Sequence, residues 1–202
     1  MIRSMSLFIE TIQLIDGQPM RIDFHQARVD RSLNSFYGSH THFDLQTCID
    51  VPEPFRNGVA KCRVVYKKKV VDIHYGNYSE KRPKCIKLVE SDVRYAFKFA
   101  DRMVFQELLE SNPGYDDVIL TRNGLITDST YCNLLFRKQG AWYTPEEPLL
   151  EGTRRASLLQ SGLVRTAKIH KNDLDHYDAL MLVNALLEFK AARALPISII
   201  AI

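Results

Sequence analysis

Two-residue turn signals between strand-like segments constrain the fold of this chain more than any other feature. An Asp-Gly pair stands at 16–17 and an Asn-Gly pair at 123–124, each directly after an apolar, β-branched segment. Such pairs favour the tight turns that join antiparallel strands. Two further strand-like segments, 59–66 and 70–75, flank a run of three lysines. We therefore expect antiparallel hairpins in both halves of the chain.

Helical patterns are interspersed with these strands. A return strand is predicted over 19–22, then a helix with Asp23 as its N-cap that ends at Gly38. A further helix is predicted to open at 151–153 and to run through Gln160. Because strands and helices do not alternate regularly, the predicted class is α+β rather than a doubly wound sheet. A soft boundary is expected near residues 90–95.

The composition of the 202 residues is that of an ordinary globular chain, and the net charge of +3 is too small to predict nucleic-acid binding. No stretch of 18 apolar residues occurs, so no membrane partner is expected. The four cysteines form no CxxC pair and the N-terminal segment lacks a signal-peptide pattern. We therefore expect reduced thiols and a cytoplasmic location. The six histidines show no metal-ligand spacing, so no metal site is predicted.

Lys98 is a candidate nucleophile because it stands between Phe97 and Phe99 in an apolar stretch. Burial lowers the pKa of a lysine, and a neutral amine can form a Schiff base. The alternative is a lysine whose stem packs on a half-exposed strand while its charged end reaches water.

A polar insert, Thr127 to Asn133, interrupts the apolar strands that follow the Asn-Gly turn. If Asp128 is buried there, its carboxylate needs a partner, and a protonated heterocyclic nitrogen would be one. The alternative is a turn closed by the Asp128 and Ser129 side chains, which is a common use of these residue types.

The segment Leu150 to Arg155 places a glycine immediately before a predicted helix. Glycine permits close approach of the backbone, and the free N–H groups at a helix start bind phosphate well. The alternative is an ordinary helix start with Thr153 as its cap. No GxSxG, GxGxxG or Walker pattern accompanies these three segments.

Taken in order, the segments resemble the fold type IV pyridoxal-phosphate enzymes, the class IV aminotransferase group. This group includes branched-chain and D-amino acid aminotransferases and 4-amino-4-deoxychorismate lyase. The resemblance runs from Leu7 to about Leu195. Its segments are Phe8–Thr11 with the first Asp-Gly pair, His25–Val29, Lys98–Arg102, Gly124–Asn133, Tyr143–Arg155 and Asp178–Ala185. It implies a small N-terminal α/β domain over residues 1–92 and a larger C-terminal domain with a β-barrel-like sheet over 93–202.

The resemblance also implies pyridoxal 5'-phosphate as the cofactor and assigns roles to seven residues. Lys98 would form the Schiff base with the cofactor and then move the substrate proton. Asp128 would face the pyridinium nitrogen and keep it protonated. The remaining roles are phosphate binding and ring packing: Arg28 and the backbone N–H groups of Thr153 and Arg154 on the phosphate, Ala185 as a further main-chain donor, and Leu150 on one ring face.

The chain departs from the family pattern in two respects. Asp128 stands where the family usually has glutamate, so its carboxylate reaches one methylene less. The family's extra N-terminal strand pair is missing, so the fold is expected to be shortened at the N-terminus. Since the missing strand pair helps to shape the substrate pocket in the family, pocket size and partner specificity are the properties that the resemblance transfers least.

The opening segment 8–13 and the Lys98–Arg102 spacing are more similar to the lyase than to the aminotransferases. The leading hypothesis is the conversion of 4-amino-4-deoxychorismate to 4-aminobenzoate and pyruvate, a step toward folate. The alternatives are transamination of a branched-chain or D-amino acid, and a non-catalytic cofactor-binding protein or partner subunit. The resemblance further implies a homodimer that acts on a small amino or 2-oxo acid.

Overall fold

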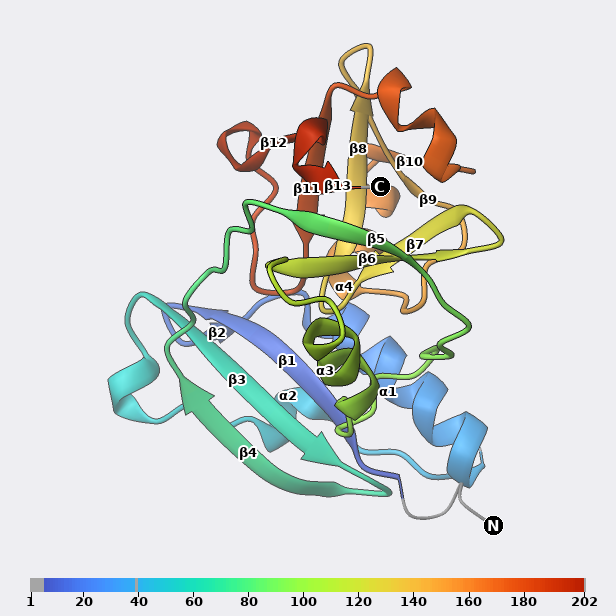
Figure 1. Cartoon of the computed structure of the whole chain (residues 1–202). Coiled ribbons are helices and arrows are strands. Elements are labelled where there is room, and N and C mark those ends of the chain that lie inside the picture. Colours follow the sequence, from blue (N-terminus) through green and yellow to red (C-terminus); the bar gives the residue numbers. More distant parts are fainter. Residues whose placement is uncertain (1–5, 39, 202) are drawn as a thin grey trace. The chain divides into compact units, whose positions relative to one another are not determined.

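The computed structural model describes residues 6–38 and 40–201 and divides the chain into two compact units (Figure 1). The first unit comprises the residues up to Glu80 together with Phe97–Asp101. The second comprises Lys81–Ala96 and the residues from Arg102 onward. The combination of antiparallel hairpins, mixed strands and separate helices confirms the predicted α+β class.

The division between the units does not fall at 92/93, where the sequence places the domain boundary. The chain enters the second unit at Lys81 because β5 (Ile86–Glu90) pairs in parallel with β6 (Asp117–Arg122). The short segment Phe97–Asp101 belongs again to the first unit because it pairs with β1 (Phe8–Ile15) through the Phe8–Phe99 bridge. Pairing with a distant strand, which the local sequence does not reveal, thus decides where the units separate.

The first unit is a four-stranded antiparallel sheet in the order β2-β1-β3-β4, with helix α1 packed against β1. Both hairpins that the sequence predicts in this half are present. The elements are β1, β2 (Gln18–Pro19), α1 (Ile22–Tyr37), α2 (Leu45–Cys48), a 3₁₀ helix (Glu53–Phe55), β3 (Val59–Tyr66) and β4 (Val70–Gly76).

The return strand of the first hairpin is shorter than predicted, and the helix cap is a different residue. β2 ends at Pro19 and α1 begins at Ile22, so Asp23 lies inside the first turn and is not the N-cap. Arg21 is the N-cap and takes a left-handed conformation with φ of 55°. Its Nη2 donates to Gln13 Oε1 at 3.0 Å, a tertiary contact that holds the chain reversal in place.

Strand β1 directs alternate side chains toward α1. Its positions 8, 10, 12 and 14 are all fully buried, and side chains two apart on a strand share one face. Three of them, Phe8, Ile12 and Leu14, form a hydrophobic core with Val29 and Leu33 of α1. The fourth position on this face is a glutamate, which is consequently enclosed in the core.

The second unit is built on a mixed sheet in the order β10-β9-β8-β7-β6-β5-β13, with β11 paired to β8 and β12. Three pairs are parallel and the others are antiparallel. The elements beyond β5 and β6 are α3 (Met103–Glu110), β7 (Leu125–Ser129), β8 (Asn133–Lys138), β9 (Ala141–Pro145), α4 (Thr153–Gln160), β10 (Val164–Ala167), β11 (Ala179–Val183), β12 (Leu195–Pro196) and β13 (Ile200–Ala201). Three 3₁₀ helices (Lys171–His176, Ala191–Arg193 and Ile197–Ile199) complete the unit.

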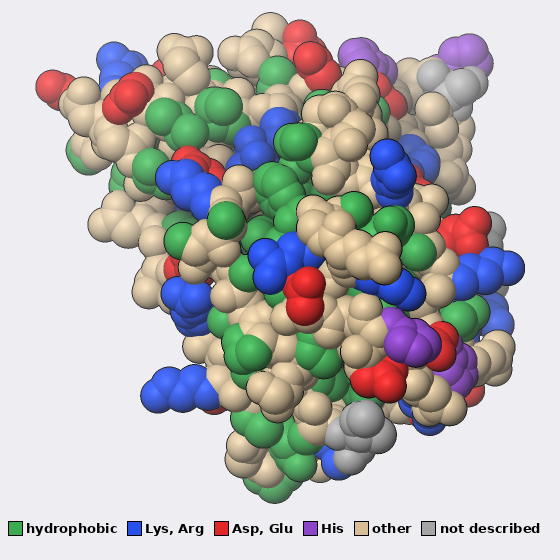
Figure 2. All heavy atoms as spheres, turned by 90° about the horizontal axis from the view of Figure 1, so that it is seen from above, with side chains coloured by type: hydrophobic (Ala, Val, Ile, Leu, Met, Phe, Trp, Pro, Cys, Tyr) green, Lys and Arg blue, Asp and Glu red, His purple; other side chains and the backbone are tan. Residues whose placement is uncertain are grey.

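The mixed charges on the surface and the free thiols are those expected from the small net charge and the cysteine spacing. On the face drawn in Figure 2, basic and acidic side chains lie interspersed among apolar and uncharged ones. Within the described residues, none of the helices combines the length and the apolar character that crossing a bilayer requires. All four cysteines are free thiols, as predicted.

Candidate functional site

Lys98 lies at the centre of a tight three-residue turn in the first unit. The Phe99 N–H donates to the Phe97 carbonyl at 3.0 Å, and the Ile9 N–H of β1 donates to the Lys98 carbonyl at 2.9 Å. Both flanking rings contact Phe36 of α1, with centroid distances of 5.0 Å for Phe97 and 5.9 Å for Phe99. The two phenylalanines anchor the turn, and the lysine between them is half-buried rather than enclosed.

Arg28 lies on the buried face of α1 and contacts Glu10, the residue that follows Ile9 in β1. Its Nε donates to Glu10 Oε1 at 2.8 Å and its Nη2 donates to Glu10 Oε2 at 2.6 Å. Strand β1 therefore binds the backbone of Lys98 through Ile9 and the side chain of Arg28 through Glu10. Of the residues predicted for the site, these two belong to the first unit and the other five to the second.

Asp128 is buried at the end of β7 and accepts a hydrogen bond on each carboxylate oxygen. Asn133 Nδ2 donates to Oδ1 at 2.8 Å, and the backbone N–H of Leu150 donates to Oδ2 at 2.9 Å. The turn after β7 is closed by Ser129, whose Oγ accepts from the Cys132 N–H at 3.2 Å. The alternative of a turn closed by the Asp128 and Ser129 side chains therefore holds for Ser129, whereas the bonds given above for the Asp128 carboxylate are with Asn133 and with the segment that precedes α4.

Asn133 joins Asp128 to the start of α4. The same Nδ2 that donates to Asp128 also donates to the Leu150 carbonyl at 2.8 Å. Its Oδ1 lies so close to Gly152 that a Cβ built on this glycine would be 1.9 Å from it. Only glycine fits here, so Asn133 holds the carboxylate and the chain before the helix in one network. Sequence reasoning assigned Asn133 to the motif but gave it no role.

Helix α4 begins without a side-chain cap. Gly152 is the N-cap, in an extended conformation, and it has no side chain with which to cap the helix. Thr153 is therefore not the cap, which was the alternative interpretation of this segment. Arg155 fixes the helix start from the other side, because its Nε donates to Thr144 Oγ1 at 3.2 Å and its Nη2 to the Pro145 carbonyl at 2.9 Å.

Arg154 and Ala185 complete the set of predicted residues in the second unit. Arg154 has a buried Nε with no hydrogen-bond partner among the described residues, and burial lowers the pKa of its guanidinium. Ala185 follows Asn184, whose Nδ2 contacts the Cys132 sulfur at 3.4 Å. The segment after β11 is thereby attached to the turn that carries Asp128 and Asn133.

The electrostatics of Asp128 are unusual for an aspartate. Complete burial raises the pKa of its carboxyl to about 7, against the opposing effect of the Leu150 N–H and Asn133 bonds. Both of these donors are neutral, so neither supplies the positive charge that an enclosed carboxylate needs to stay ionised. A cationic N–H beside this carboxyl would supply that charge.

These features fit a phosphorylated pyridine cofactor. The second unit offers an enclosed carboxyl that lacks a directly bound cation, a helix start without a side-chain cap, and a buried guanidinium N–H without a partner among the described residues. The glycine before the helix leaves no room for a side chain. Such a set could bind a protonated ring nitrogen and a phosphate group.

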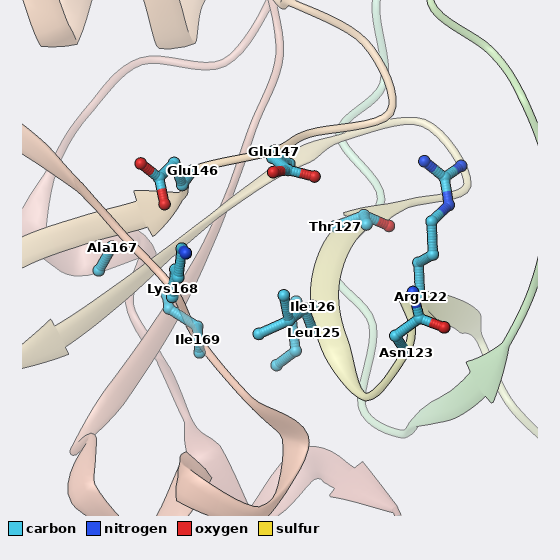
Figure 3. Close-up of a pocket in the computed structure, with 10 residues that line it drawn as sticks. All are labelled: Arg122, Asn123, Leu125, Ile126, Thr127, Glu146, Glu147, Ala167, Lys168 and Ile169. Atoms are coloured by element: carbon cyan, nitrogen blue, oxygen red, sulfur yellow. The ribbon is translucent and has the colours of Figure 1, made fainter.

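A surface pocket of the second unit lies next to this network but is lined by other residues. It is formed by residues 122–123, 125–127, 146–147 and 167–169 (Figure 3). Of its lining residues, Thr127 is the nearest in the sequence to Asp128, which it immediately precedes. None of the seven predicted site residues lines this pocket.

Replacing Gly152 by alanine should disturb Asp128 and α4 together. The added Cβ must displace Asn133, so we expect the free energy of unfolding to fall by about 1–3 kcal/mol and the affinity for pyridoxal phosphate to weaken. Chemical denaturation and cofactor titration measure the two effects. Gly76→Ala is the matched control, because a Cβ there meets nothing within 4 Å. A Gly152→Ala protein as stable as the wild type would contradict the close contact.

Asp128 should make the stability of the cofactor-free protein depend on pH. The pKa of this carboxyl is about 7 in the folded protein and 3.8 for the ordinary group. The protonated carboxyl therefore makes its full contribution to the free energy of unfolding below pH 3.8. That contribution, about 4 kcal/mol in total, is lost as the pH rises from 3.8 through 7. Denaturation curves from pH 4 to 8 should show this decline in the wild type and a weaker decline in Asp128→Asn. Exposed Asp92→Asn serves as the control, and equal slopes in all three proteins would contradict the assignment.

Comparison with known proteins places the chain in a family. The family model "Amino-transferase class IV" matches residues 98–195. A crystal structure from Haemophilus somnus 129pt, provisionally named as a 4-amino-4-deoxychorismate lyase, is 34% identical. It superposes with a TM-score of 0.82 over 90% of this chain and 97% of that one.

Two further relatives match most of this chain. An uncharacterized protein of Haemophilus influenzae is 33% identical over 180 residues, which are 88% of this chain and 96% of that protein. A Mesorhizobium loti structure, provisionally named as an amino-acid aminotransferase, shares the fold at 21% identity. Its TM-score is 0.74, with 94% of this chain and 97% of that one covered. The chain therefore belongs to the class IV aminotransferase family, the pyridoxal-phosphate-dependent enzymes of fold type IV.

Proposed function

We propose that this protein is a pyridoxal-phosphate-dependent enzyme of the 4-amino-4-deoxychorismate lyase type, which releases 4-aminobenzoate and pyruvate. The observation that carries the cofactor chemistry is the network of Asp128, Asn133 and Leu150 directly before α4. This network combines a buried carboxyl and an uncapped helix start, the two groups that a pyridine ring nitrogen and a phosphate require. The choice of the lyase is supported by the relative of 34% identity and its provisional name.

In this proposal the residues of the chain divide the work between binding and proton transfer. When bound, pyridoxal phosphate supplies an aldehyde that links covalently to an amine and a ring that withdraws electrons. Asp128 keeps the ring nitrogen protonated. Arg28, the N–H groups of Thr153 and Arg154, and Ala185 hold the phosphate, and Leu150 packs against the ring.

Lys98 is proposed as the residue that carries the covalent link and moves the proton. The neutral amine of Lys98 would take the proton from the carbon that bears the substrate's amino group. Breaking the bond between the ring carbon and the enol ether oxygen releases the three-carbon fragment. That fragment gains one proton, which balances the proton that Lys98 removed, and becomes pyruvate, while the six-membered ring becomes aromatic without any change in overall oxidation state.

Transamination of a branched-chain or D-amino acid is the second candidate. It uses the same lysine and carboxylate but requires a 2-oxo acid to regenerate the enzyme. The Mesorhizobium loti relative carries an aminotransferase name, although at 21% identity it supports only a common fold.

We further propose that the protein works as a homodimer in the cytoplasm on a small amino acid.

Lys98 should be the residue that bonds covalently to the cofactor. Borohydride reduction of the protein with pyridoxal phosphate should fix the cofactor to the peptide that contains residue 98, as detected by mass spectrometry. Lys98→Ala should lose both this label and turnover. Lys81→Ala, at an exposed position, should retain both. A label on another lysine would refute the assignment.

The dependence on an acceptor should separate the two candidate reactions. With 4-amino-4-deoxychorismate as substrate, we expect 4-aminobenzoate and pyruvate in equal amounts in the absence of any 2-oxo acid. Chromatographic quantification of both products measures this outcome. If turnover appears only with an amino acid and a 2-oxo acid together, the protein is an aminotransferase. If neither reaction occurs while the cofactor binds at Lys98, a non-catalytic role is indicated.

A further inference from the structure

The first unit encloses a cluster of three ionisable side chains of which only Arg28 has an assigned role. Glu10 of β1 is fully buried, and both His25 and Arg28 of α1 bond to it. His25 Nδ1 lies 2.5 Å from Glu10 Oε2, and His25 is fully buried as well. Burying such charges in a hydrophobic core costs free energy, so the cluster calls for an explanation beyond stability.

The contacts in this cluster shift the pKa values of Glu10 and His25 downward. The Glu10 pKa is lowered to about 2 because the Arg28 charge and the hydrogen bonds from His25 and Arg28 outweigh the burial that raises it. Burial lowers the pKa of His25 in spite of its bond to Glu10. At neutral pH, Glu10 is therefore an anion and His25 a neutral donor. Because a carboxylate only accepts, Nδ1 must carry the His25 proton.

The orientation of the Arg28 guanidinium follows from this arrangement. Its Nε and Nη2 form the bidentate contact with the two oxygens of Glu10. A guanidinium is planar and has a second fork, formed by its two terminal nitrogens, which is suited to phosphate oxygens. Glu10 thus sets the plane in which this second fork lies, while His25 holds the carboxylate from the other side.

We propose that Glu10 is a positioning residue, braced by His25, that orients the terminal fork of Arg28 toward the phosphate of the cofactor. The proposal rests on the proposed function, in which Arg28 binds that phosphate. It adds that this binding depends on the direction of the hydrogen bonds more than on net charge, because the charge of Arg28 is already balanced by Glu10.

If net charge governs phosphate binding, the effect of Glu10→Gln on affinity should be opposite to the effect expected if the orientation of Arg28 governs it. Removing the negative charge leaves the cluster more positive, so charge alone would tighten the binding of a phosphate. If Glu10 orients Arg28, the same substitution loosens the guanidinium and weakens the binding. We expect the affinity for pyridoxal phosphate to fall at least tenfold and the affinity for pyridoxal, which lacks the phosphate, to remain unchanged.

The experiment measures dissociation constants for pyridoxal phosphate and for pyridoxal by absorbance titration of the full chain. The proteins are the wild type, Glu10→Gln, Arg28→Lys and the double variant. Lysine keeps the charge of Arg28 without its fork, so Glu10→Gln should cause no further loss once Arg28→Lys is present. Glu10→Asp, which withdraws the carboxylate by one methylene, replaces Glu10→Gln if circular dichroism shows the latter to be unfolded.

Gln13→Ala is the matched control. Gln13 is a buried polar residue of the same strand, and its Oε1 also accepts a hydrogen bond from an arginine, Arg21. This variant should lower the melting temperature and leave the ratio of the two dissociation constants unchanged. It therefore separates loss of stability in the first unit from loss of Arg28 orientation.

The outcomes distinguish this proposal from the proposed function. A wild type that binds pyridoxal phosphate no more tightly than pyridoxal overturns both. A wild type that prefers the phosphate, together with a Glu10→Gln variant that binds it equally well or better, overturns the role of Glu10 alone. Equal weakening for both compounds also overturns that role, since it indicates a general structural effect.

Discussion

A buried carboxylate needs hydrogen-bond donors. Each unit of this protein encloses one carboxylate that is bonded to donors from neighbouring segments. In the first unit the carboxylate is Glu10, enclosed between β1 and α1. In the second unit it is Asp128, enclosed between the end of β7 and the chain that leads into α4. An unpaired carboxylate in either place would cost several kcal/mol, so the neighbouring segments must lie where their donors can reach it. The positions of Arg28, Asn133 and Leu150 follow from this requirement.

The two carboxylates differ in the charge of their partners, and their pKa values move in opposite directions as a result. Glu10 is bonded to a guanidinium, so its pKa falls to about 2. Asp128 is bonded to a side-chain amide and a backbone N–H, both neutral, and burial raises its pKa to about 7. Glu10 therefore already has its counter-charge, whereas Asp128 is suited to accept one from a ligand. This contrast favours a structural and orienting function for the first and a cofactor-binding function for the second.

Local sequence patterns predict the elements more reliably than the contacts between them. The Asp-Gly turn, the hairpin around the lysine run and helix α4 all lie where the patterns predict them. The left-handed Arg21 could not be foreseen, because Gln13, its stabilising partner, comes from the preceding strand. The same holds for the turn at Lys98, which is fixed by β1 and by the Phe36 ring of α1, remote in the sequence.

The sequence by itself determined the class of fold, the order of the motifs and the residue types from which a cofactor site could be built, because turn chemistry and side-chain periodicity are local properties. It also identified Lys98, Arg28 and Asp128 as the residues of interest. Only the tertiary structure decided that Glu10 is enclosed with Arg28 and His25, and that Asn133 connects Asp128 to the start of α4. Burial and hydrogen-bond partners arise when distant segments pack together, and they determine the charge and orientation of each group.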